Sequence, residues 1–118
     1  MVMMEIHEED RLLRRVQFLD PNFIKDDGTP ASSSFTPKKG ENGLSVDLER
    51  LTTYAKAIQD KNRFRLFAIK AGVSNSLGLN NHHDPQEDNP AHCLIKGHFT
   101  KSVCRKLAKS AVRIAYPK

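Results

Sequence analysis

The sequence lacks tryptophan, and aromatic residues make up only 7% of its 118 residues. It also lacks any run near the roughly 18 consecutive apolar residues that a membrane-spanning helix requires. Its N-terminal segment is charged where a secretory signal would be apolar. Two cysteines are too few for a disulfide framework and fit a reducing compartment. These absences argue against membrane proteins and disulfide-stabilised secreted proteins. They predict a cytoplasmic protein whose residues 1–118 form a single domain.

Acidic residues are absent from the C-terminal quarter of the chain, because none follows Asp88. Residues 1–88 contain twelve Lys and Arg against fourteen Asp and Glu, a formal charge of −2, whereas residues 89–118 contain seven Lys and Arg and carry +7. This asymmetry predicts an anionic partner for the C-terminal segment, such as nucleic acid or an acidic protein surface. A solvated helix face that only aids solubility is the alternative.

Two main helices are predicted. Residues 48–59 carry apolar side chains at helical spacing after Asp47, which is a favourable N-cap. Residues 100–115 form the clearest predicted helix, because their apolar and basic side chains occupy opposite arcs. The basic arc, together with one neighbouring lysine, makes up the predicted polyanion-binding surface: Lys96, Lys101, Arg105, Lys106, Lys109 and Arg113.

The remaining periodicity predicts a small sheet. Residues 63–70 are apolar on both faces, so this strand is expected to be central. Shorter strands are expected at residues 44–46, 79–82 and 92–96, and at residues 12–18, where a short helix is the alternative. A short helix at residues 71–77 would end at Gly78. Residues 25–42 are predicted to be an irregular loop anchored by Phe35. The fold class is therefore α+β, with a mixed or antiparallel sheet covered mainly on one face by the two main helices.

The chain contains four short motifs: Pro-Ala-Ser-Ser-Ser-Phe at residues 30–35, Gly-Leu-Ser-Val at 43–46, Asn-Pro-Ala-His at 89–92, and the basic helix at 102–108. In this combination the chain resembles a group of small uncharacterised bacterial proteins. Those proteins share a serine–phenylalanine loop, a Leu-Ser-Val segment, a Pro-Ala-His element and a basic C-terminal helix. The resemblance covers most of the chain. It implies no activity, but it does imply that the first three motifs are more than loop filler.

His92 is the strongest candidate for chemistry, because it follows a proline-containing turn and begins a strand, where an imidazole can act as a general acid or base. Candidate nucleophiles are Ser33, Ser34, Ser45 and Cys93, and nothing in the sequence places any of them beside His92. The alternative is a structural His92 that bonds the loop backbone and fixes the turn.

Six residues that can bind metal ions lie within seventeen positions: His82, His83, Asp84, His92, Cys93 and His98. Adjacent residues of a strand point to opposite faces, so neither His82 and His83 nor His92 and Cys93 can bind one ion together. No zinc-type spacing occurs either. Neither a metal site nor a cofactor is therefore predicted, and both cysteines are expected to be buried apolar residues.

Three functions remain as hypotheses. The first is a non-enzymatic binding module that contacts nucleic acid or an acidic protein through its C-terminal helix. The second is a small hydrolase, nuclease or nucleotide-processing toxin-like enzyme centred on His92. A separate enzyme candidate is a compact nucleotide-handling domain, in which Arg14 or Arg15 with the serine loop resembles ADP-ribosyltransferase-like domains by fold-level analogy. The third is an accessory subunit whose surface is covered by a partner. No membrane contact is predicted.

Overall fold

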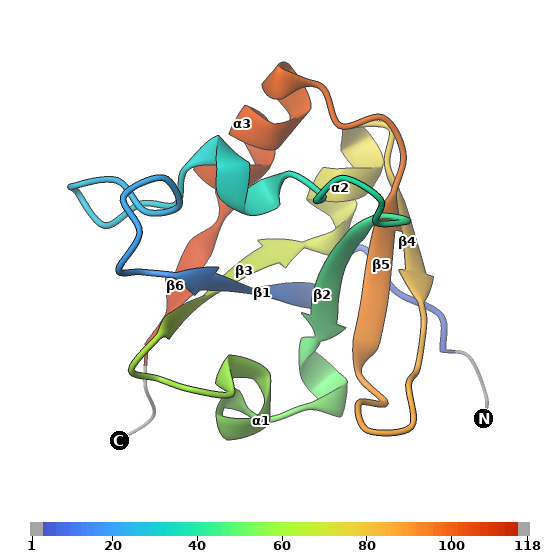
Figure 1. Cartoon of the computed structure of the whole chain (residues 1–118). Coiled ribbons are helices and arrows are strands. Elements are labelled where there is room, and N and C mark those ends of the chain that lie inside the picture. The colour runs from blue at the N-terminus through green and yellow to red at the C-terminus, as the bar shows by residue number, and fades with distance from the viewer. Residues whose placement is uncertain (1–3, 116–118) are drawn as a thin grey trace.

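Strands far apart in the sequence assemble into one antiparallel sheet in the order β4-β5-β2-β1-β3-β6 (Figure 1). The computed structural model describes residues 4–115. Within this range the strands are β1 (Arg11–Gln17), β2 (Leu44–Leu48), β3 (Phe64–Lys70), β4 (Asn80–His83), β5 (His92–Lys96) and β6 (Val112–Ile114). Every pairing of neighbouring strands is antiparallel. The predicted α+β class is thus confirmed, with an antiparallel sheet in a single domain.

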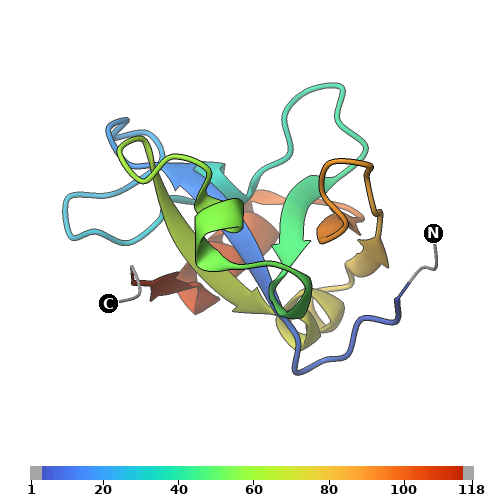
Figure 2. The same ribbon diagram turned by 90° about the horizontal axis from the view of Figure 1, so that it is seen from below.

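Helices lie on both faces of the sheet (Figures 1 and 2). The helices α2 (Ala71–Ser76) and α3 (Lys101–Ser110) lie on one face with the 3-10 helix η1 (Ser32–Phe35), and α1 (Tyr54–Ile58) lies on the other. Side chains that alternate along the strands therefore enter two separate cores: Leu12 packs on the α3 side and Leu13 on the α1 side. The prediction that both main helices cover mainly one face is wrong. None of the helices in the described part of the chain is long and apolar enough to cross a membrane.

The helix predicted over residues 48–59 is wrong in extent. Leu48 ends β2, a 3-10 turn η2 (Glu49–Leu51) follows, and α1 begins only after Thr53, whose side chain accepts a hydrogen bond from Lys56 N. Leu48 is fully buried and pairs with Leu12 of β1. Its apolar side chain therefore belongs to a strand, although its spacing fits a helix equally well. Asp47 is a buried strand residue and not an N-cap.

The C-terminal helix begins as predicted, because Thr100 caps it by accepting from Val103 N at 3.1 Å. It ends five residues early, at Ser110, and residues 112–114 form β6 on the edge beside β3. Extended pairing suits the β-branched Val112 and Ile114. The basic surface predicted on one helix therefore loses Arg113, which lies on β6.

The remaining predictions about the sheet are mostly confirmed. β3 is paired on both sides, although β2 and β1 occupy the middle of the sheet. Gly78 follows α2 with φ +81°, the left-handed conformation that ends a helix. Residues 25–42 are irregular apart from η1, and Phe35 is fully buried there.

β1 and β2 pair over only two positions, Leu12 with Leu48 and Leu13 with Asp47. β1 continues alongside β3 for its whole length, whereas β2 follows β5. Beyond Leu13 the two central strands therefore diverge (Figure 1). A cavity lies there, lined among others by residues 14–17 of β1 and by Ser45 of β2, and we call it the β1–β2 slot.

Candidate active site

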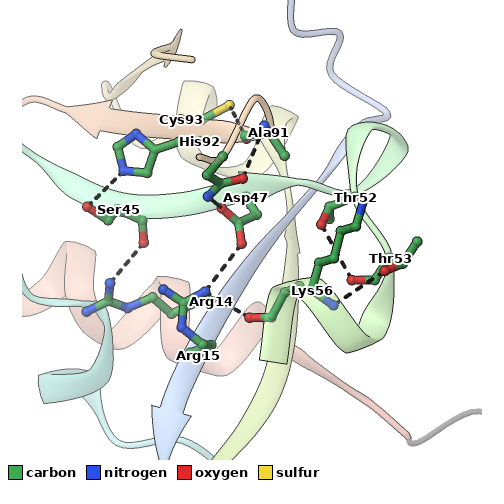
Figure 3. A network of polar contacts seen from close by, with 12 residues as sticks. Arg14, Arg15, Ser45, Asp47, Thr52, Thr53, Lys56, Ala91, His92 and Cys93 are labelled. Carbon is green, nitrogen blue, oxygen red and sulfur yellow. Dashed lines mark hydrogen bonds and ion pairs between the residues drawn. The ribbon is translucent and has the colours of Figure 1, made fainter. Parts of the chain in front are cut away.

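Ser45, His92 and Asp84 form a hydrogen-bonded chain beside the β1–β2 slot. The His92 Nε2 atom lies 3.3 Å from Ser45 Oγ (Figure 3). On the other side of the ring, His92 Nδ1 lies 3.1 Å from the carboxylate Oδ2 of Asp84 and 3.1 Å from the main-chain oxygen of the same residue. A serine, a histidine and an aspartate are thus connected through the two ring nitrogens in the order that nucleophilic catalysis requires.

The contacts of His92 determine which nitrogen carries the proton. Both atoms of Asp84 that face Nδ1 are acceptors, so in the neutral ring Nδ1 carries the proton and donates it. Nε2 then has a free lone pair directed at the hydroxyl of Ser45. This tautomer can accept a proton from Ser45, as a general base must.

The strand register explains how these residues meet. β2 and β5 pair Asp47 with His92 and Ser45 with Leu94, so Ser45 is a diagonal neighbour of His92 on the same face of the sheet. Asp84 directly follows β4, and its N–H donates to the main-chain oxygen of His92 at 2.9 Å. Two adjacent strand pairs therefore set the geometry.

A buried ionic contact between Asp47 and Arg15 supports this arrangement. Asp47 is only 4% exposed. Its Oδ1 accepts from Asn89 Nδ2 at 2.8 Å, and its Oδ2 accepts from Arg15 Nη1 at 3.3 Å (Figure 3). The same Arg15 nitrogen donates to the Ala57 carbonyl at 2.8 Å. Asp47 thereby connects the loop before β5, which precedes His92, to β1 and α1.

The site is partly sheltered from solvent. The His92 side chain is 13% exposed and the Asp84 side chain is 47% exposed. Ser45 is partly exposed and lines a cavity of about 280 Å³ in the β1–β2 slot, together with Arg14, Arg15 and Ser34. A small molecule in this cavity would lie beside Ser45.

Arg14 closes the inner end of the slot. Its Nε donates to the Ser34 carbonyl at 2.9 Å. Its Nη1 donates to the Ser45 carbonyl at 2.9 Å (Figure 3). Burial lowers the pKa of this guanidinium, although an arginine remains charged at neutral pH. Arg14 therefore ties the serine loop and β2 to β1, at the place where main-chain pairing between β1 and β2 has ended.

His83 provides a contrast with His92. It is buried, its Nδ1 accepts from Met4 N at 2.8 Å, and its Nε2 donates to the Pro90 carbonyl at 2.7 Å. Both ring nitrogens are thus bonded to the backbone, which is the structural arrangement considered above for His92. Of the two histidines, only His92 has a ring nitrogen directed at a side chain that can act as a nucleophile.

The other predicted nucleophiles lie elsewhere. Ser33 donates to the Asn22 carbonyl, and Ser34 donates to the Phe23 carbonyl at 2.6 Å, so both hydroxyls hold the loop together. Cys93 is fully buried on the opposite side of β5 from His92, and burial raises the pKa of its thiol to about 12. Such a thiol is not a nucleophile at neutral pH.

The candidate metal ligands do not converge. Within residues 4–115, no three His, Cys, Asp or Glu side chains gather in a group that could hold an ion. His82 and His98 are exposed, and Cys104 is buried in the core, as predicted for both cysteines.

The predicted basic residues are all exposed, and none of them forms an ion pair with another residue in the described range. They divide between three elements. Lys101, Arg105, Lys106 and Lys109 lie on α3, Lys96 ends β5, and Arg113 lies on β6. We call the four residues on α3 the basic face.

Asp84 is the residue of the candidate site that sequence reasoning did not assign to it, because Asp84 was considered only as a metal ligand. Its position eight residues before His92, across the turn between two strands, is the one signal that could have paired the two. No protein-family model, curated protein or solved structure matches this chain. The resemblance to small bacterial proteins therefore stays a prediction.

Proposed function

We propose that the chain is a small hydrolase in which Ser45 is the nucleophile, His92 the general base and acid, and Asp84 the partner that orients and stabilises the imidazole. The observation that carries this proposal is the pair of contacts that the two ring nitrogens of His92 make, with Asp84 on one side and Ser45 on the other. The Nδ1–H of His92 donates a hydrogen bond to the two oxygen atoms of Asp84, so the lone pair of Nε2 faces Ser45 Oγ at 3.3 Å.

In the proposed reaction, Ser45 Oγ attacks the carbonyl carbon of an ester or amide while its proton passes to His92 Nε2. The tetrahedral intermediate collapses as that proton moves from Nε2 to the leaving oxygen or nitrogen, which departs and leaves the acyl group on Ser45. Water then attacks the acyl carbon and gives a proton to Nε2. Return of this proton to Ser45 Oγ releases the carboxylic acid. Asp84 stabilises the imidazolium between the transfers without taking its proton.

An alkyl fluorophosphonate probe tests the proposal, because it phosphonylates serines whose hydroxyl is activated by a neighbouring base. Intact-mass and peptide analysis should find a single adduct on Ser45. Ser45→Ala should abolish labelling, and His92→Ala should slow it about 10⁴-fold or more, the scale on which such groups act together.

Two exposed residues provide matched controls. Ser102→Ala removes a serine from α3 and His98→Ala removes a histidine from the loop before it, and neither should change the labelling rate. Labelling that is absent in the folded wild type, or that persists in His92→Ala, would reject the hydrolase.

Polyanion binding is a second candidate function, and the basic face favours it. Its four cationic side chains are exposed without an ion-pair partner in the described range. Phosphate contacts by such residues release counterions, so binding should weaken steeply with salt. The test is titration of labelled DNA and RNA at two salt concentrations. Lys101→Glu with Lys109→Glu should weaken binding. Arg113→Glu, the same kind of charge reversal away from the helix, should not. Absence of binding at low salt would remove this candidate.

A further inference from the structure

The guanidinium of Arg14 has more donors than the protein uses. An arginine side chain has five N–H donors. In Arg14 one is bonded to the Ser34 carbonyl and one to the Ser45 carbonyl. No other hydrogen bond and no ion pair engages this side chain within residues 4–115. Nη2 and the second proton of Nη1 are therefore available to a ligand.

Arg14 is one of the residues that line the cavity of the β1–β2 slot. Arg14 lines this cavity of about 280 Å³ together with Ser45, Arg15, Lys38 and Glu41. Three of these side chains are cationic and one is acidic. Glu41 is exposed and accepts from Lys38 N at 3.1 Å, so it lies at the rim, whereas Arg14 is half-buried at the inner end. The charge of Glu41 also acts on Arg14, so the cavity keeps a net positive lining of three cations against one carboxylate. Its volume is close to the lower limit of roughly 300 Å³ for small-molecule sites.

The neighbouring Arg15 is less available to bind an anion than Arg14. Its charge is opposed by Asp47 at 3.3 Å, and its Nη1 also donates to the Ala57 carbonyl. Arg14 and Arg15 are adjacent in β1 and so point to opposite faces of the sheet. Ser45 shares its face with Asp47 and Arg15, whereas Arg14 reaches Ser45 through the main-chain carbonyl. Within residues 4–115, Arg14 is the arginine lining the slot that forms no ion pair, and Lys38 lies at the opening.

We infer that the β1–β2 slot binds the anionic group of the substrate, a phosphate or a carboxylate, through Arg14 at its inner end and Lys38 at its rim. This assignment of the substrate class rests on the proposed hydrolase, because Arg14 is bonded to the main-chain carbonyl of Ser45 and both residues line the same cavity. A guanidinium with free Nη donors presents a planar fork that matches either oxyanion with two hydrogen bonds. The substrates would be small esters or amides that carry a second, negatively charged group.

The hydrogen bonds from the Arg14 side chain to two main-chain carbonyls hold its guanidinium in place before a ligand binds. Two of its N–H groups are fixed on main-chain oxygens of different elements, one in η1 and one in β2. The side chain therefore loses little conformational freedom when a ligand binds, which lowers the cost of binding.

Calorimetric titration of the whole chain with inorganic phosphate and with benzoate tests the inference, and benzamide serves as the uncharged analogue of benzoate. At least one anion should bind and benzamide should bind far more weakly. The stronger of the two anions identifies the chemical source of the charge. Arg14→Gln should weaken binding by about 10- to 100-fold, the effect of losing charged hydrogen bonds.

Arg14→Gln also removes contacts to two carbonyls, so a second variant keeps the test valid if that protein does not fold. Lys38 is exposed, and Lys38→Glu should weaken anion binding several-fold without affecting the fold. Lys109→Gln, which removes an exposed charge from the basic face, should leave binding unchanged. Failure of both anions to bind, binding unchanged by Lys38→Glu, or binding lost in Lys109→Gln would each overturn the inference.

Ser45→Ala separates this inference from the proposed hydrolase. The variant should bind the anion as well as the wild type, because the donors belong to Arg14 and Lys38. If the wild type is phosphonylated on Ser45 but binds neither anion, the hydrolase stands and the inference fails. If an anion binds with the expected dependence on Arg14 and Lys38 but Ser45 does not react, the anion site stands and the catalytic role of Ser45 is rejected.

Discussion

Asp84→Asn tests the proposed catalytic chain most directly, because the amide has the shape of the carboxylate but no charge. An asparagine that turned its NH₂ group toward His92 would force the ring proton onto Nε2 and prevent proton transfer from Ser45. In a buried triad that change of tautomer costs about 10⁴-fold in rate. Here the main-chain oxygen of residue 84 also lies 3.1 Å from Nδ1. This acceptor remains after the substitution and keeps the proton on Nδ1.

The expected loss is therefore limited to the charge that stabilises the imidazolium. The Asp84 carboxylate is 47% exposed and lies 3.1 Å from Nδ1. With an effective dielectric constant of about 40–80 for a half-exposed pair, Coulomb's law gives ~1.3–2.7 kcal/mol at this distance. Since each ~1.4 kcal/mol corresponds to a tenfold change in rate, Asp84→Asn should slow labelling of Ser45 about 10- to 100-fold.

The assay is the rate of Ser45 phosphonylation, followed by intact mass at a fixed probe concentration and neutral pH. Asp88→Asn removes an exposed carboxylate from the same loop and should leave the rate within about twofold, because the charge of an exposed carboxylate is screened by solvent. A loss near 10⁴-fold in Asp84→Asn would show that the carboxylate alone fixes the tautomer. An unchanged rate would show that Asp84 has no part in activating His92. Either result refutes the reasoning above.

Three further predictions concern stability. Leu107→Ala should lower the free energy of unfolding by about 3–5 kcal/mol in urea denaturation, because the fully buried leucine of α3 would leave a cavity; a loss below about 1 kcal/mol would show that the helix packs loosely. Gly43→Ala should lower the melting temperature, since a Cβ there would lie 2.7 Å from the main-chain oxygen of Ile95, and an unchanged temperature would contradict this close approach. The buried Cys93 thiol, with its pKa raised from 9.0 to about 12, stays protonated in the folded state while the unfolded state ionises. The free energy of unfolding should therefore fall by ~1.4 kcal/mol per pH unit above about pH 9 because of this thiol. Cys93→Ala should remove this part of the pH dependence. An equal pH dependence in both proteins would exclude a contribution from Cys93.

Predictions that depended on local patterns were largely confirmed. Residues 63–70 form a strand because their apolar side chains suit a sheet with a core on each face. The cap at Thr100 and the left-handed turn at Gly78 follow from the chemistry of single residues. Predictions failed where a periodic pattern was compatible with two structures. Leu48 fits the spacing of a helix, yet its pairing with Leu12 places it in a strand. Ile114 likewise continues the apolar arc predicted for the C-terminal helix but pairs with Leu66 at the edge of the sheet.

The candidate site also combines residues that the sequence indicates with contacts that only strand pairing creates. Sequence reasoning identified His92 and named Ser45 among several nucleophiles, but it could not bring them together. Their contact depends on the register between β2 and β5, and one residue of slippage would turn Ser45 away from His92. Asp84 could not be assigned either, because its contact with Nδ1 of His92 follows from the pairing of β4 with β5.

By itself, the sequence determined the α+β class, most strands, the start of the C-terminal helix and the exposed positive charge of that helix, because these follow from side-chain periodicity and local capping. The tertiary structure alone decided which face each helix covers, where β1 and β2 diverge, and which side chains line the resulting slot. These features depend on pairings between residues tens of positions apart. Arg14 illustrates the difference: in sequence it is one of two adjacent arginines, and in the fold it is the cation with free donors beside Ser45.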